Sequence, residues 1–368
     1  MKRLTVIAVL FLFSLIISGQ QSQTSFNPKP PNVEIKGTQV QKIFSDIMNE
    51  EYELHIHLPR FYDDVNRKFP VLFVIDSQWD FPLINAIFGS QYYDGFIPEI
   101  VIVGVTWANK DVSVDKIRAR DFTPTVQPGF AESGKASSFL NFFRNELVPY
   151  IETNYRVSTD RGLVGSSFGG LFTLFALLTE TDLFNKYFLT SPSLYWDNGL
   201  LFKLEEEYSK KHSDLNVSLY MAMGSYEELT LFNKMIDVLE SRNYKSFRFD
   251  HKIIDGMGHS GAKAEGFTRG MQFVYERPIV NVNTDILKKY IGDYEIQPGL
   301  TVKIILEENI LYVVSPYFTK VRLYPTSEIE FYSKGEYSLG EFMFDDKGSV
   351  TGLKVKQFAN EITLKKIN

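Results

Sequence analysis

The sequence has no cysteine among its 368 residues. This absence excludes disulfide bonds, metal sites built on thiolate ligands and a lipid anchor attached through cysteine. A chain of this length is large enough to be stable without disulfides. We therefore expect a fold held together by its hydrophobic core, with neither a metal nor a cofactor.

An excess of basic residues is also lacking. Lys and Arg number 39 against 45 Asp and Glu, for a net charge of −6. This balance argues against nucleic acid or an anionic membrane as the main partner. The apolar fraction of 44% and the charged fraction of 23% are typical of a folded soluble protein. The length allows one large domain and one small one.

The apolar run at the N-terminus, residues 4–17, is too short for a comfortable membrane span. Lys2 and Arg3 precede it and Ser18-Gly19-Gln20 follows it, which is the pattern of a secretory signal peptide. We therefore predict a signal peptide over residues 1–20, a linker over residues 21–32 and a periplasmic or secreted protein with no membrane span after cleavage. An uncleaved anchor is the alternative.

Residues 33–280 alternate between strand-like and helix-like patterns. Polar and apolar residues alternate over 52–58, which indicates a half-buried antiparallel strand at one edge of a sheet. Further strands are expected at 71–75, 100–105, 187–190, 217–223 and 247–254, and helices at 139–150, 171–178 and from about 264. This alternation predicts an α/β fold with a mostly parallel sheet flanked by helices.

The pattern changes near Arg277-Pro278. Short β-rich segments such as 301–306 and 310–314 follow, separated by turn residues and without helical periodicity. We predict a separate small all-β domain over residues 283–368.

The segment Gly165-Ser166-Ser167-Phe168-Gly169-Gly170 has the form of a nucleophile elbow, a sharp turn between a strand and a helix. Such a turn holds its central serine, here Ser167, in a strained conformation with the hydroxyl exposed. Glycines two residues before and after that serine avoid collisions with the neighbouring strand and helix. The predicted strand before the motif and the helix after it make it more than a chance match.

A nucleophilic serine needs a base, usually histidine, and an acid that orients the base. Among the five histidines, His259 alone lies in a glycine-rich loop after a predicted strand, residues 255–261, and is our candidate base. The acid should follow the strand 217–223, where Glu227 is the candidate and Glu228 its rival. The alternative for both glutamates is a non-catalytic one, in which they are solvated carboxylates at the start of a helix.

The oxyanion of the reaction needs two backbone N–H groups. We expect one from Phe168, directly after the nucleophile, and one from Gln78 in the loop after strand 71–75, with Ser77 as the alternative.

With these residues assigned, the chain resembles the esterase D and enterobactin esterase group of the α/β-hydrolases. The matching segments run in the same order as in that family, over about residues 35–278. They are 73–79, 120–125, 146–152, the elbow, Ser191-Pro192-Ser193-Leu194-Tyr195-Trp196 and Gly258-His259. The last 85 or so residues resemble a small β-domain appended to some serine hydrolases.

The resemblance implies ester hydrolysis through an acyl-enzyme, with Ser167 as nucleophile, His259 as base and small-molecule or carbohydrate esters, siderophore esters included, as substrates. Candidate pocket residues are Trp79, Arg120, Phe122, Tyr195 and Trp196. Positive charge near the pocket would favour an anionic siderophore, and one stretch holds Lys110, Lys116, Arg118 and Arg120. The interleaved Asp111, Asp115 and Asp121 favour a solvated loop of mixed charge instead. A binding protein on a hydrolase fold and an acyltransferase with the same triad are the competing hypotheses.

Overall fold

The computed structural model describes residues 32–60, 62–63, 66–109, 111–315, 318–335, 338–357 and 360–367. The predicted signal peptide, and the predicted linker apart from its last residue, lie outside these residues. Within the described ranges, no helix is long and apolar enough to span a membrane.

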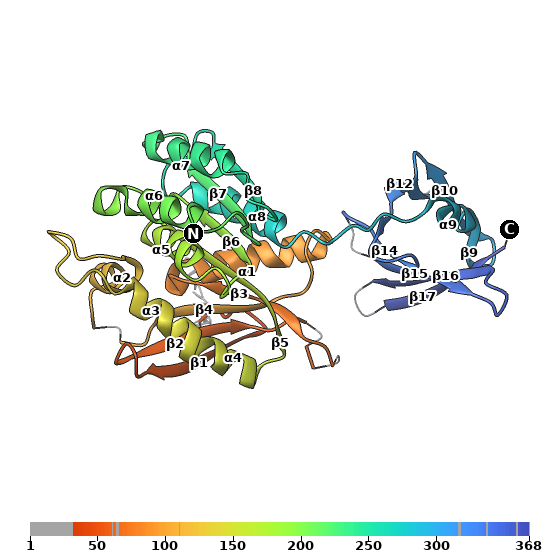
Figure 1. The fold of residues 1–368 in the computed structure, drawn as a ribbon. Helices are drawn as coiled ribbons and strands as arrows, with labels where there is room; N and C mark the ends of the chain where they lie inside the picture. Colours follow the sequence, from red (N-terminus) through yellow and green to blue (C-terminus); the bar gives the residue numbers. More distant parts are fainter. Residues whose placement is uncertain are drawn as a thin grey trace, which may run out of the picture. The chain divides into compact units, whose positions relative to one another are not determined.

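Strands and helices alternate through the first three quarters of the chain (Figure 1). The strands of this part are β1 (Thr38–Ser45), β2 (Glu50–His57), β3 (Phe69–Val74), β4 (Val101–Trp107), β5 (Val157–Ser166), β6 (Lys186–Thr190), β7 (Ser218–Gly224) and β8 (Arg248–Ile254). The helices are α1 (Ser77–Tyr93), α2 (Val114–Phe122), α3 (Ala136–Phe142), the π-helical turn η1 (Phe143–Leu147), α4 (Val148–Asn154), α5 (Phe168–Thr179), α6 (Trp196–Ser209), α7 (Thr230–Ser241) and α8 (Ala262–Val274).

The eight strands form one sheet in the order β1-β2-β4-β3-β5-β6-β7-β8. The β1–β2 and β2–β4 pairs are antiparallel, and all other neighbours are parallel. The mostly parallel sheet is therefore as predicted. The predicted strand over 52–58 is β2, which lies one place in from the edge because β1 covers it.

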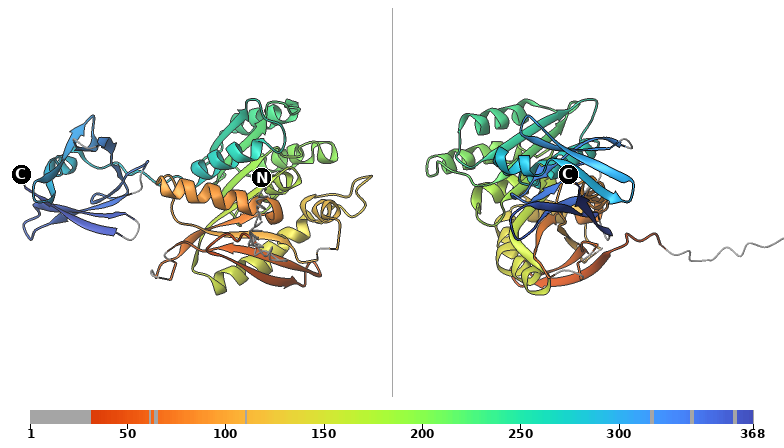
Figure 2. Two further views of the ribbon diagram at one scale, coloured as in Figure 1. Left: turned by 180° about the vertical axis from the view of Figure 1, so that it is seen from behind. Right: turned by 90° about the vertical axis from the view of Figure 1, so that its right-hand side faces the viewer.

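Helices cover both faces of this sheet (Figures 1 and 2). One face packs against α1 and α8 through apolar residues such as Val74, Phe188 and Met271. The other packs against the helices from α2 to α7 through a larger core that includes Phe73, Phe143 and Phe172. Central strands buried on both faces explain why their sequences are almost continuously apolar.

The C-terminal part forms a second sheet, with every pair antiparallel. Its elements are α9 (Thr284–Lys289), β9 (Gly292–Gln297), β10 (Leu300–Glu307), β11 (Ile310–Ser315), β12 (Phe318–Arg322), β13 (Tyr324–Pro325), β14 (Glu330–Tyr332), β15 (Leu339–Phe344), β16 (Val350–Gln357) and β17 (Asn360–Lys366). The order β12-β11-β10-β9-β17-β16-β15-β14-β13 joins the last strand to the first. This sheet has its own core, in which Tyr290 stacks on Phe342.

His57 on β2 is held against α1. Asn85 Nδ2 lies 3.0 Å from His57 Nδ1, and the Phe88 ring meets the imidazole edge-on. Because an amide nitrogen only donates, Nδ1 accepts, which fits a neutral imidazole. Burial lowers the pKa of His57 to about 4 from its ordinary 6.5.

This depressed pKa predicts a loss of stability in mild acid. As the pH falls from about 6.5 to about 4, the unfolded chain binds a proton at His57 that the folded chain does not. The contribution of His57 is therefore complete above pH 6.5 and is lost progressively down to pH 4. Urea unfolding across this range should show a smaller loss for His57→Gln than for the wild type, with exposed His212→Gln as control. Equal losses in all three proteins would contradict the assignment.

Candidate active site

Ser167 lies at the turn between β5 and α5 with φ 61° and ψ −119°, a conformation that residues with side chains rarely adopt. Its N–H donates to the carbonyl of Thr190, and its carbonyl accepts from the N–H groups of Leu171 and Ser193. A Cβ on Gly165 would lie 2.4 Å from the carbonyl oxygen of Gly169, so a side chain there would displace the turn. The local geometry is that of the predicted elbow.

His259 lies in the loop between β8 and α8, and its Nδ1 is 2.7 Å from Glu227 Oε2. About half of the imidazole is exposed, while the Glu227 side chain is only 11% exposed. The other carboxylate oxygen, Oε1, accepts hydrogen bonds from Ser191 Oγ and from the N–H of Gly224. Three groups thus hold the carboxylate of Glu227 in one orientation.

Glu228, the rival acid, has a different role. Its Oε1 accepts from the N–H of Thr230 at the first turn of α7. Hydrogen bonds from Thr230 lower the pKa of the Glu228 carboxyl, as expected of a carboxylate at a helix N-terminus. The Glu228 carboxylate therefore bonds the backbone at the start of α7, while Glu227 faces the histidine.

Two cavities meet at Ser167 and His259, and both residues line each of them. The first, of about 510 Å³, has walls from α1, α2 and the start of α8, including Trp79, Arg118 and Lys263. The second, of about 630 Å³, has walls from the loops after β6 and β7 and from α7, including Leu194, Tyr195 and Phe232. A substrate with one group on each side of the reacting bond fits this arrangement.

The loop after β3 leads into α1 through Asp76, which has a left-handed backbone with φ 55°. The N–H groups of Trp79 and Asp80 donate to the carbonyl of Asp76. Within the described ranges, no protein acceptor is bonded to the N–H of Gln78 or of Phe168. These are the two groups predicted to bind the oxyanion, and that role stays a prediction.

Side chains anchor this loop at three points. Arg118 donates from Nε and Nη2 to the two carboxylate oxygens of Asp76. Ser77 Oγ is 2.7 Å from His55 Nδ1, and Gln78 Oε1 accepts from Thr106 Oγ1. The His55 ring also contacts Phe81 of α1 edge-on.

Of the candidate pocket residues, Trp79 lines the first cavity and Tyr195 the second, whereas Arg120, Phe122 and Trp196 line neither of these two. Phe122 is 1% exposed and packs in the core. Arg120 bonds Asp121 and Glu50. Trp196 is buried, with its ring against Phe168 and its Nε1 donating to Thr125. The expectation for these three is corrected: an amphipathic helix and a buried turn direct them inward.

Two ion pairs at the first cavity were not foreseen. The solvated mixed-charge loop expected around Arg118 is instead the helix α2, from which Arg118 reaches the buried Asp76. On the same wall, Lys263 Nζ donates to Asp80 Oδ1 at 2.8 Å. Burial raises the pKa of Asp76 and of Asp80, and the paired cations oppose that rise. Sequence spacing holds no signal for these pairs, because their partners come from different elements.

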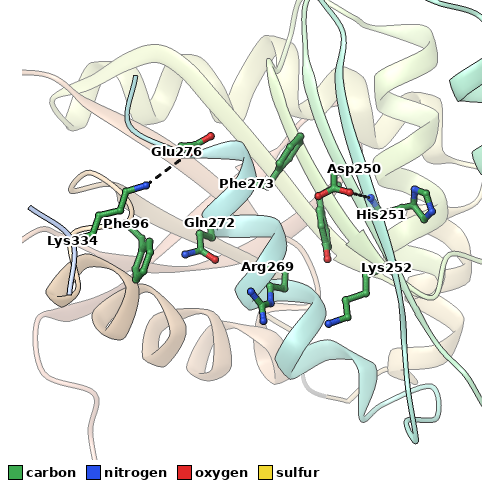
Figure 3. Close-up of a pocket in the computed structure, with 10 residues that line it drawn as sticks. Phe96, Asp250, His251, Lys252, Arg269, Gln272, Phe273, Glu276 and Lys334 are labelled. Carbon is green, nitrogen blue, oxygen red and sulfur yellow. Dashed lines mark hydrogen bonds and ion pairs between the residues drawn. The ribbon is translucent and has the colours of Figure 1, made fainter. Parts of the chain in front are cut away.

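A third hollow lies beside the edge strand β8 and the outer half of α8 (Figure 3). Asp250, His251 and Lys252 of β8, Arg269 of α8 and Glu276 just after α8 line it. Neither Ser167 nor His259 is among its lining residues. Among the described residues, no group of three or more His, Asp or Glu side chains is placed to hold a metal ion.

Curated relatives of this chain include esterases. Ferri-bacillibactin esterase BesA of Bacillus subtilis (strain 168) is 29% identical over 218 residues, covering 53% of this chain and 72% of the relative. The siderophore triacetylfusarinine C esterase of Aspergillus fumigatus is 28% identical over 189 residues, covering 49% of this chain and 65% of the relative.

Solved structures share the fold of the larger sheet. The BES protein from Bacillus cereus matches with a TM-score of 0.60 and 25% identity, covering 67% of this chain and 97% of that one. The IroE-like serine hydrolase from Shewanella oneidensis matches with a TM-score of 0.59 and 27% identity, covering 69% and 85%. The predicted α/β-hydrolase fold with a C-terminal antiparallel β-domain is confirmed.

The Esterase family model, described as "Putative esterase", matches residues 45–261, which is more than half of the chain. The chain therefore belongs to the Esterase family and is a carboxylic ester hydrolase.

Proposed function

We propose that Ser167, His259 and Glu227 form the catalytic triad of this esterase. The observation that carries the proposal is the 2.7 Å contact between His259 Nδ1 and Glu227 Oε2, with His259 lining both cavities that Ser167 lines. In the neutral imidazole, an Nδ1–H that donates to the carboxylate leaves Nε2 as an acceptor. Nε2 then takes the proton of the Ser167 hydroxyl as Oγ attacks the ester carbonyl.

The remaining steps follow from the same groups. The N–H groups of Phe168 and Gln78 hold the oxyanion of the tetrahedral intermediate. His259 returns the proton to the leaving alcohol, which leaves an acyl group on Ser167. Water deprotonated by His259 then attacks the acyl-enzyme and releases the acid.

We propose siderophore-type esters as the substrate class, with carbohydrate esters as the second candidate. Arg118 uses Nε and Nη2 on Asp76, and Lys263 has a single acceptor, Asp80. Arg118 and Lys263 line the first cavity, while Asp76 and Asp80 are 1% and 2% exposed. The cavity thus offers donors to electron-rich oxygens beside the ester, such as those of a catecholate. Two relatives of the chain are named ferri-bacillibactin esterase and siderophore triacetylfusarinine C esterase, which supports this substrate class.

We also propose that the enzyme is exported. The support is the charged start, apolar run and small-residue segment of residues 1–20.

The triad predicts that Ser167→Ala abolishes turnover of p-nitrophenyl esters while the urea midpoint stays near that of the wild type. The wild type should also be labelled by a fluorophosphonate probe, and Ser167→Ala should not. Ser166→Ala is the matched control, since its neighbouring hydroxyl is buried. If Ser167→Ala turned over these esters as fast as the wild type, the proposed triad would be refuted. Transfer of the acyl group to an added alcohol in place of water would identify an acyltransferase.

The donors in the first cavity predict a substrate-dependent defect. In the double variant Asp80→Asn/Lys263→Gln, a neutral hydrogen-bonded pair replaces the ion pair. We expect the KM for an anionic catecholate ester to rise about tenfold, about the energy of one hydrogen bond to a charged group. Turnover of neutral p-nitrophenyl acetate should change less than about twofold, because that substrate does not use the ion pair.

The control for this experiment is Lys252→Gln, which removes an ion pair with Glu265 outside both cavities. Equal losses on the anionic and the neutral ester would argue against a role of Lys263 in substrate choice. A preference for feruloyl or acetyl sugars in an ester panel would favour the carbohydrate alternative.

Export predicts that the mature protein begins after about residue 20 when the full chain is expressed in a Gram-negative host. N-terminal sequencing of the periplasmic fraction measures this. An intact N-terminus in the cytoplasmic fraction would contradict export, and one in the membrane fraction would indicate an uncleaved anchor.

A further inference from the structure

Ser191 follows β6 directly and begins the Ser191-Pro192-Ser193 turn. Its hydroxyl oxygen Oγ lies 2.6 Å from Glu227 Oε1, and its N–H donates to the carbonyl of Ala222 on β7. The side chain is 2% exposed, so water does not compete for this hydrogen bond. Within the chain, 36 residues separate the two partners, and only the parallel pairing of β6 with β7 brings them together.

The hydroxyl of Ser191 is one of the three groups that contact the carboxylate of Glu227. Oε2 faces His259, while Oε1 receives one donor from the Ser191 side chain and one from the N–H of Gly224. An ionised carboxylate only accepts, so Ser191 Oγ must be the donor. Without that hydroxyl, the N–H of Gly224 is the one remaining donor to Oε1 in the described part of the chain.

The backbone of Ser191 supports a role for its side chain. Its φ of 47° lies in the left-handed region, where glycine is relaxed and a residue with a Cβ is disfavoured. Packing alone would therefore be better served by glycine. The hydrogen bond to Glu227 gives a physical reason for a serine at this position.

The same turn holds the nucleophile through its backbone. The N–H of Ser167 donates to the carbonyl of Thr190, and the N–H of Ser193 donates to the carbonyl of Ser167. Residues 190–193 thus hold Ser167 by main-chain bonds and Glu227 by a side-chain bond. A substitution that keeps the backbone but removes the hydroxyl separates these two functions.

We propose that Ser191 is a positioning residue of this esterase, which acts through Glu227 by fixing the carboxylate that orients His259. This proposal rests on the proposed triad. It predicts that the hydroxyl of Ser191 sets kcat and leaves substrate binding unchanged, because Ser191 Oγ bonds the acid and the acid contacts the base.

Two substitutions test this proposal in opposite directions. Ser191→Gly removes the hydroxyl and relaxes the backbone, so we expect kcat to fall about tenfold, with KM within about twofold and an equal or higher urea midpoint. Ser191→Thr keeps the hydroxyl but puts a β-branched side chain at positive φ. We expect a lower urea midpoint with kcat within about threefold of the wild type.

A spectroscopic readout accompanies the kinetics. The proton between His259 Nδ1 and Glu227 should give a low-field proton NMR resonance in the wild type and in Ser191→Thr. The resonance should shift or broaden in Ser191→Gly, because the carboxylate is held less firmly. A structural role alone would not move it.

Wild-type kcat and an unchanged low-field resonance in Ser191→Gly would overturn the positioning role while leaving the triad intact. Losses of kcat that follow the loss of stability in both variants would also overturn it. A wild-type protein that neither hydrolyses esters nor reacts with fluorophosphonate would overturn the triad and this proposal together.

Discussion

The site depends on a backbone conformation that Ser167 would not hold by itself. Its positive φ is maintained by hydrogen bonds on both sides, from its N–H to Thr190 and to its carbonyl from Leu171 and Ser193. Because β6 and α5 are buried in the core, these bonds cannot relax without disturbing the sheet. Packing thus maintains a strained turn that local propensity disfavours.

The charged groups around this turn follow a second constraint. Asp76 and Asp80 are buried carboxylates, and burial of a charge is costly unless a partner offsets it. Arg118 and Lys263 supply that partner from two different helices, so each ion pair ties α1 to another element. The same geometry places cationic N–H groups at the cavity wall and fixes the loop that leads into α1. The ion pairs that support this loop are thus the same groups to which our proposal assigns substrate recognition.

Sequence patterns predicted the elements of the larger sheet well where burial is uniform. The runs at 71–75 and 100–105 are strands because both of their faces are covered, and a continuous apolar run records this directly. Patterns were weaker where a side chain's surroundings depend on distant elements. Phe122 and Arg120 were expected at the pocket, yet Phe122 packs in the core and Arg120 bonds the buried Asp121. Adjacency to a motif carries no information about which way a helix faces.

Local spacing, glycine positions and apolar periodicity were enough to predict the elbow, the candidate base and the fold class. The sequence left Glu227 and Glu228 as rivals, since both follow the same strand. In the structure, Glu228 accepts a hydrogen bond at the start of α7, while Glu227 contacts His259 and Ser191. The direction of a carboxylate depends on its donors, and those of Glu227 come from the end of β7 and from the loops after β6 and β8, which only the pairing of these strands brings together.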